Sequence, residues 1–163
     1  MLNFFFPQWC VGCGKGGELI CFSCLQTLSP VVPPLCPRCG RPQPDGVLCS
    51  SCRNWHADID GIRSPYIFHG VIRQAIHELK YKNLRTLAFP LAGLLRNYII
   101  ENPVPGEVIV PVPLHKNRLR ERGYNQSGLL ARELAKLIDL PVVDDCLVRQ
   151  HHTSPQAKTS ALG

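Results

Sequence analysis

Four Cys-x-x-Cys pairs lie within the first 52 residues of this 163-residue chain and limit what that part can fold into. A Cys-x-x-Cys turn directs two thiolates to one point, and two such turns provide the four soft ligands that a tetrahedral zinc ion prefers. The sequence therefore predicts small domains that are stabilised by metal rather than by a large apolar core. The predicted ligands are Cys10, Cys13, Cys21, Cys24, Cys36, Cys39, Cys49 and Cys52.

The cysteine array is an internal duplication. Each copy reads Cys-x-x-Cys-Gly, a tip rich in glycine or proline, two apolar residues and a second Cys-x-x-Cys. Gly14 and Gly40 stand where the backbone must turn around the metal, a position suited to positive φ. Because each copy holds a complete ligand set across a short loop, we favour two zinc ions, one in each copy. An interleaved arrangement, with the first and third pairs on one ion, is the second possibility, and disulfides are the third.

The composition changes near His56, where the cysteine-rich part ends. We therefore predict a double zinc ribbon over residues 1–56 and an α/β domain over residues 57–163. The apolar opening, residues 1–7, lacks the basic flank of a secretory signal, and the later apolar stretch 87–95 is about half a membrane span. We expect a cytoplasmic protein without a membrane span, in which thiols stay reduced.

The charge balance excludes some classes of protein. Eighteen Lys and Arg residues against twelve Asp and Glu give a net charge of +6, and charged residues make up only 18% of the chain. That content excludes a coiled coil or a highly charged tail. The basic excess is compatible with partners that carry phosphate groups.

The second region alternates between strand and helix patterns. Residues 66–68 and 108–110 read as short strands, and apolar spacing predicts helices over residues 70–81 and 87–100 and a third helix after Gln126. The run Val-Ile-Val at 108–110 is apolar throughout, as expected for a parallel strand that is buried on both faces. We therefore expect a parallel sheet.

A basic cluster follows the second of these strands. In open α/β sheets, ligands collect at the carboxyl ends of strands and at the amino ends of the helices after them. We therefore predict that a basic loop here binds phosphate or pyrophosphate, with a solvated charged loop as the alternative. Gly123 and Asn125 permit the tight backbone of an anion cradle. The candidate residues are His115, Lys116, Arg118, Arg120, Arg122, Gly123 and Asn125.

Several motifs together resemble the ComF family of competence-related, phosphoribosyltransferase-like proteins. They are the four Cys-x-x-Cys pairs, Ile76-x-x-Leu79-Lys80-Tyr81, Val110-Pro-Val-Pro-Leu114 and Arg122-Gly-Tyr-Asn-Gln126. The resemblance implies that the second region is an incomplete type I phosphoribosyltransferase-like parallel-sheet domain whose pyrophosphate-facing loop lies at residues 114–118. An intact member would bind phosphoribosyl pyrophosphate (PRPP) with Mg²⁺. The resemblance also implies a role in DNA uptake or handling, with single-stranded DNA and DNA-uptake proteins as partners.

One feature of type I phosphoribosyltransferases is not completed. After an apolar strand they carry two acidic residues and then a loop with Thr and Gly that binds the 5-phosphate of PRPP. Asp144 and Asp145 imitate the acidic pair, but Cys146-Leu-Val-Arg149 follows where Thr and Gly are required. We therefore expect a truncated, catalytically incomplete member. The alternative is a non-catalytic zinc-ribbon module that contacts nucleic acid or protein.

Overall fold

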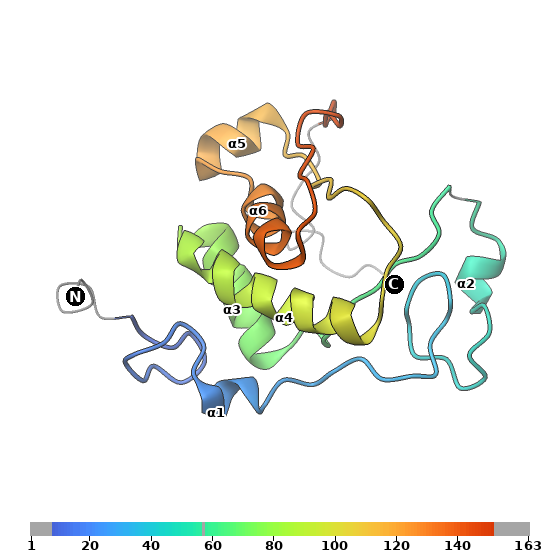
Figure 1. Ribbon diagram of the computed structural model, residues 1–163, viewed down its shortest axis with the longest axis horizontal. Coiled ribbons are helices and arrows are strands. Elements are labelled where there is room, and N and C mark those ends of the chain that lie inside the picture. The colour runs from blue at the N-terminus through green and yellow to red at the C-terminus, as the bar shows by residue number, and fades with distance from the viewer. Residues whose placement is uncertain (1–7, 57, 152–163) are drawn as a thin grey trace, which may run out of the picture. The chain divides into compact units, whose positions relative to one another are not determined.

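Figure 1 shows the protein as a computed structural model, which describes residues 8–56 and 58–151. The chain divides into two compact units, residues 1–76 and residues 77–163, and the boundary in the sequence falls within helix α3 (Gly70–Tyr81). The last part of the predicted second domain, residues 152–163, lies outside the described residues. No helix in the described ranges is long and apolar enough to cross a membrane.

The first unit begins with two small ribbons that repeat each other. Each has an isolated antiparallel bridge at the same place, between Trp9 and Gly16 in the first and between Leu35 and Pro42 in the second. Each also ends in a single helical turn that carries the last cysteine of its group. These turns are α1 (Phe22–Leu25) and α2 (Ser50–Arg53). The duplication seen in the sequence is therefore a duplication of structure.

The segment after the second ribbon packs back on the ribbons. The backbone N–H of Ile62 donates to the carbonyl of Arg38 at 2.6 Å. Farther along, residues 65–67 pair with the linker 29–31 through one antiparallel bridge and backbone hydrogen bonds of 2.9 and 3.0 Å. Of the strand predicted at residues 66–68, only this bridge is present. The packing also explains why the first unit extends beyond the change in composition at His56.

The second unit is mainly helical. The helix predicted over residues 70–81 is confirmed, and its later part enters this unit. The helix predicted over 87–100 is also present, although a 3₁₀ turn opens it. The elements are η1 (Arg85–Leu87), α4 (Ala88–Glu101), α5 (Lys116–Arg122) and α6 (Gln126–Ile138).

Helices α4 and α6 pack on each other and form the core of this unit. Figure 1 shows α4 lengthwise with α6 beside it. Leu91 and Ala92 of α4 are buried, as are Ala131 and Leu134 of α6. The segments that form the pocket described below start from this core.

The predicted parallel sheet is reduced to one bridge within the described residues. Ile109 pairs in parallel with Val142 through backbone hydrogen bonds of 2.8 and 3.0 Å. Val108 and Val110 are 49% and 38% exposed, so this segment is not buried on both faces as we expected. Burial of a parallel strand requires neighbours at both edges and cover on both faces, and the described part of the chain provides one neighbour.

We predict that alanine is tolerated less well at Gly40 than at Gly14. Both residues follow a Cys-x-x-Cys turn with positive φ, 69° and 73°. A Cβ at Gly40 would lie 2.6 Å from the carbonyl oxygen of Ile62, whereas nothing lies within 4 Å of one at Gly14. Gly14→Ala should cost about 1 kcal/mol from backbone strain alone, and Gly40→Ala should cost more because the returning segment must move. Thermal unfolding of the zinc-loaded proteins measures the difference, and equal losses would contradict it.

Candidate metal centres and a cationic pocket

The eight paired cysteines gather into two groups, and each group consists of the cysteines of one repeat. Within each group the four sulfur atoms all lie within 4.8 Å of one another. The structure therefore contains the sequential arrangement and not the interleaved one. All nine cysteines are free thiols, so disulfides are not formed. The groups are Cys10, Cys13, Cys21 and Cys24, and Cys36, Cys39, Cys49 and Cys52.

Backbone amides point at the first sulfur of each group. The N–H of Cys21 donates to Sγ of Cys10 at 3.3 Å, and the N–H of Cys49 donates to Sγ of Cys36 at 3.5 Å. Such hydrogen bonds stabilise a thiolate. Four sulfur donors in this setting fit a structural zinc ion, which would supply folding energy to its ribbon.

The pKa values of the thiols differ within each group. Burial raises the pKa of Cys10, but backbone amides outweigh burial and bring this pKa down to about 6. Backbone amides likewise lower the pKa of Cys36 to about 6. Burial and the neighbouring thiols raise the pKa of Cys24 and of Cys52 to about 12. Each group thus holds a ready thiolate and a thiol whose proton zinc would displace.

The second ribbon has little core apart from its cysteines. Cys36, Cys49 and Cys52 form a buried cluster, against which Leu48 and Trp55 pack. The ribbon arginines support this cluster from the outside. The guanidinium of Arg38 donates to the carbonyl of Trp55, and Nε of Arg53 donates to the carbonyl of Leu48 at 3.3 Å. These two arginines therefore help to hold the ribbon together.

A pocket of about 380 Å³ lies in the second unit. Its lining residues include three cationic side chains and one carboxylate. Burial lowers the pKa of Lys80, and the positive charge of Arg122 lowers it further. An anion in the pocket would offset both effects, because it favours the protonated amine. The lining residues are Lys80, Tyr81, Asn83, Arg118, Glu121, Arg122 and Tyr124.

Arg118, Glu121 and Arg122 of α5 line the pocket, and Gly123 follows them at the end of the helix. Gly123 has φ 78°, and its N–H donates to the carbonyl of Leu119 at 2.8 Å, which ends α5 in a left-handed cap. Arg122 donates to Oε1 of Gln126 and places its guanidinium carbon 5.4 Å from the ring centre of Tyr81. The end of α5 is thereby held against the end of α3.

Tyr124 also lines the pocket and links the α5–α6 connection to α3. Its side chain is buried, and its hydroxyl donates to the carbonyl of Leu79 in the last turn of α3. The guanidinium of Arg85 lies over its ring, with the guanidinium carbon 4.5 Å from the ring centre. Nε of Arg85 also donates to Oδ1 of Asn83 at 2.9 Å. The loop after α3 and the start of α6 are therefore joined through one tyrosine.

The predicted basic loop is in fact a helix, α5. Two of its four predicted cations, Arg118 and Arg122, line the pocket, whereas Lys116 and Arg120 are exposed at other positions of the helix. The prediction of a loop was wrong because one leucine, Leu119, gives too little apolar periodicity to reveal a helix.

The other predicted anion ligands have structural roles at helix ends. Nδ1 of His115 accepts a hydrogen bond from the N–H of Asn117 at 3.3 Å and caps α5. Oδ1 of Asn125 accepts from the N–H of Ser127 at 3.0 Å and caps α6. Sequence reasoning missed Tyr81, Asn83 and Tyr124 as pocket residues. The available signal was their position in or beside the motifs that end at Tyr81 and Gln126.

The comparisons with known proteins agree with this organisation. Residues 1–53 match the double zinc ribbon domain family. The chain is 31% identical to competence protein ComFC of Bacillus subtilis, 29% identical to competence protein F of Haemophilus influenzae and 30% identical to DNA utilization protein YhgH of Salmonella typhi. These alignments cover 79%, 99% and 87% of this chain and 57%, 73% and 65% of the respective relatives. No solved structure gives a significant match.

Residues 1–53 form a double zinc ribbon domain, and the chain is similar to relatives that are named competence protein or DNA utilization protein. The resemblance to the ComF family is confirmed, and the chain is homologous to the ComFC, competence protein F and YhgH proteins over most of its length. It spans 57% of the length of the Bacillus subtilis relative.

We predict that the purified protein carries two zinc ions and that each cysteine group binds its ion independently. Cys10→Ser and Cys36→Ser should each remove one ion, and the double variant should remove both, because the two sulfurs belong to different groups. Elemental analysis after dialysis gives the zinc content. An interleaved site would give a different result, since the double variant would then keep one ion.

Proposed function

We propose that this protein acts in DNA uptake or utilisation by binding single-stranded DNA through the cationic pocket of its second unit. The observation that carries the proposal is the charge of the lining, with Lys80, Arg118 and Arg122 against Glu121. Phosphate oxygens are the natural partners of such a cluster, because charge-assisted hydrogen bonds from guanidinium and ammonium groups are strong. The names of the relatives, competence protein and DNA utilization protein, supply the biological context.

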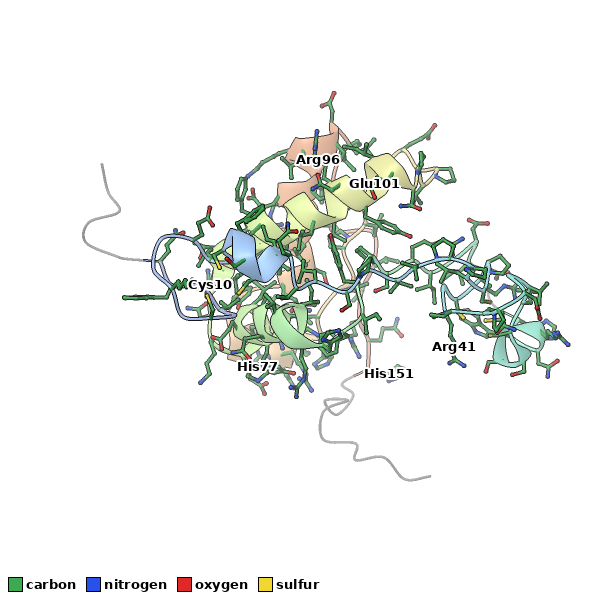
Figure 2. The ribbon with its side chains drawn as sticks, turned by 90° about the horizontal axis from the view of Figure 1, so that it is seen from below. Cys10, Arg41, His77, Arg96, Glu101 and His151 are labelled. Carbon is green, nitrogen blue, oxygen red and sulfur yellow. The ribbon has the colours of Figure 1, made fainter. Side chains whose placement is uncertain are left out.

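The ribbons are a weaker candidate for the DNA contact. Arg38 and Arg53 donate to backbone carbonyls of their own ribbon, so part of the hydrogen-bonding capacity of their guanidinium groups is already used. Lys15 and Arg41 are exposed, and Figure 2 shows Arg41 extending outward from the second ribbon. Two separate cations produce a weaker positive electrostatic potential than the cluster of cations in the pocket does.

We also propose that residues 57–163 form the front part of a phosphoribosyltransferase-like parallel-sheet domain. Support comes from the parallel pairing of Ile109 with Val142, because a helical connection, α5 and α6, joins these two segments. A helix that joins two parallel-paired segments is the basic unit of such sheets. In an intact member, the pocket would bind the pyrophosphate group of PRPP with Mg²⁺. A cytoplasmic location and contacts with DNA-uptake proteins belong to the same proposal.

The DNA proposal predicts a salt dependence that depends on the pocket. For single strands, log K falls with log salt concentration by about 0.7 for each phosphate neutralised. Arg118→Ala/Arg122→Ala should therefore flatten the slope by about 1.4, if each arginine contacts one phosphate. Fluorescence anisotropy of a labelled oligonucleotide across a salt series measures this slope.

Helix α5 offers a matched control for that experiment. Lys116→Ala/Arg120→Ala removes the same charge from the same helix but outside the pocket, so it should leave the slope nearly unchanged. If both double variants flatten the salt slope equally, the DNA contact lies on the exposed face of α5. A slope that neither pair alters would argue against DNA binding here and favour the protein-contact alternative.

A second prediction concerns PRPP. With Mg²⁺ present, PRPP should bind no more tightly than inorganic pyrophosphate, because the sequence lacks the acidic pair followed by Thr and Gly. Arg118→Ala/Arg122→Ala should abolish the binding of both ligands. Titration calorimetry compares them directly. Binding of PRPP about tenfold tighter than pyrophosphate, or about 1.4 kcal/mol, would show that other residues recognise the ribose 5-phosphate.

A further inference from the structure

Tyr81 is a large aromatic side chain at the edge of the cationic pocket. It is the last residue of α3, it lines the pocket, and it remains 51% exposed. Lys80 precedes it, and the guanidinium carbon of Arg122 lies 5.4 Å from its ring centre. About half of the surface of this residue is exposed to water, so burial in the second unit does not explain why an aromatic residue lies here.

A second ring extends this aromatic surface along α3. His77 lies one helical turn before Tyr81, with the ring centres 4.9 Å apart and the ring planes at 48°. The His77 side chain is exposed and is labelled on α3 in Figure 2. The two rings and the three cations of the pocket belong to the same unit of the chain. An inorganic anion would use the cations but would have no use for the rings.

We propose that Tyr81 stacks on a nucleobase of the DNA strand whose phosphate occupies the pocket. This inference rests on the proposed function and adds recognition of the base to recognition of the phosphate. Proteins that bind single strands without sequence preference combine cations for the backbone with aromatic rings for the bases, because every base has a π-face. Arg122 contacts the ring of Tyr81, so one arginine can both orient the ring and add positive charge beside the phosphate.

Stacking and phosphate binding leave different signatures. Phosphate contacts release counterions and set the slope of affinity against salt, whereas stacking adds affinity that depends little on salt. An abasic oligonucleotide keeps the phosphates and removes the bases. Comparison of a thymidine oligonucleotide with an abasic one of the same length therefore isolates the contribution of the bases.

The test is a mutant cycle with these two oligonucleotides. The unmodified protein should prefer the thymidine strand over the abasic strand by about 5- to 150-fold, the range for loss of one stacked base. Tyr81→Ala should remove most of this preference and leave the salt slope unchanged. Tyr81→Phe should retain the preference, since it keeps the ring, and it also guards against a loss of folding.

Phe89 provides the matched control. It is 64% exposed on α4 and does not line the pocket, so Phe89→Ala should leave the preference unchanged. If Tyr81→Ala keeps the full preference and the salt slope still responds to Arg118→Ala/Arg122→Ala, the stacking inference is overturned and phosphate binding stands. If the unmodified protein binds neither strand, both proposals are overturned.

Discussion

The hydrogen bond from the hydroxyl of Tyr124 to the carbonyl of Leu79 is the contact on which the pocket depends. Leu79 lies in the last turn of α3, where helix carbonyls lack partners within the helix. Tyr124 satisfies one of these carbonyls and brings the start of α6 to the end of α3. Because Gly123 turns the chain just before it, the end of α5 arrives at the same place. This hydrogen bond and the contact of Arg122 with the ring of Tyr81 together bring Lys80 and Arg122 near each other.

The pocket gathers three cationic side chains and one carboxylate, that of Glu121. Lys80 and Arg122 lie in the last turns of their helices, where the helix dipole favours cations. Aromatic rings also take part, since Arg122 contacts Tyr81 and Arg85 contacts Tyr124. Helix ends and ring faces thus stabilise these cations, a role that carboxylates have on an ordinary protein surface. Helix ends and aromatic rings carry no net charge, so they stabilise Lys80 and Arg122 without cancelling their positive charge.

The sequence predicted those parts of the molecule that depend on residues close to one another in the sequence. The cysteine groups follow from spacing within each repeat, and the helix over residues 70–81 follows from apolar periodicity. The sheet was predicted less well, because the burial of Val108 and Val110 depends on strands that are distant in sequence. The pocket could be located only in part. The hydrogen bond on which it depends connects Leu79 to Tyr124, 45 residues apart, and no local pattern records such a contact.

The net charge of +6 is therefore a poor guide to where an anion binds. Arg38 and Arg53 are basic residues of the ribbons, but they donate to carbonyls that hold the second ribbon around its cysteines. His115 and Asn125 belong to the basic cluster of the sequence, yet they cap helices. The arginines that hold the second ribbon together and the cations that line the pocket are thus different residues. Ligand contacts on α5 can therefore change without loosening the second ribbon, because Arg38 and Arg53 donate to the carbonyls of Trp55 and Leu48.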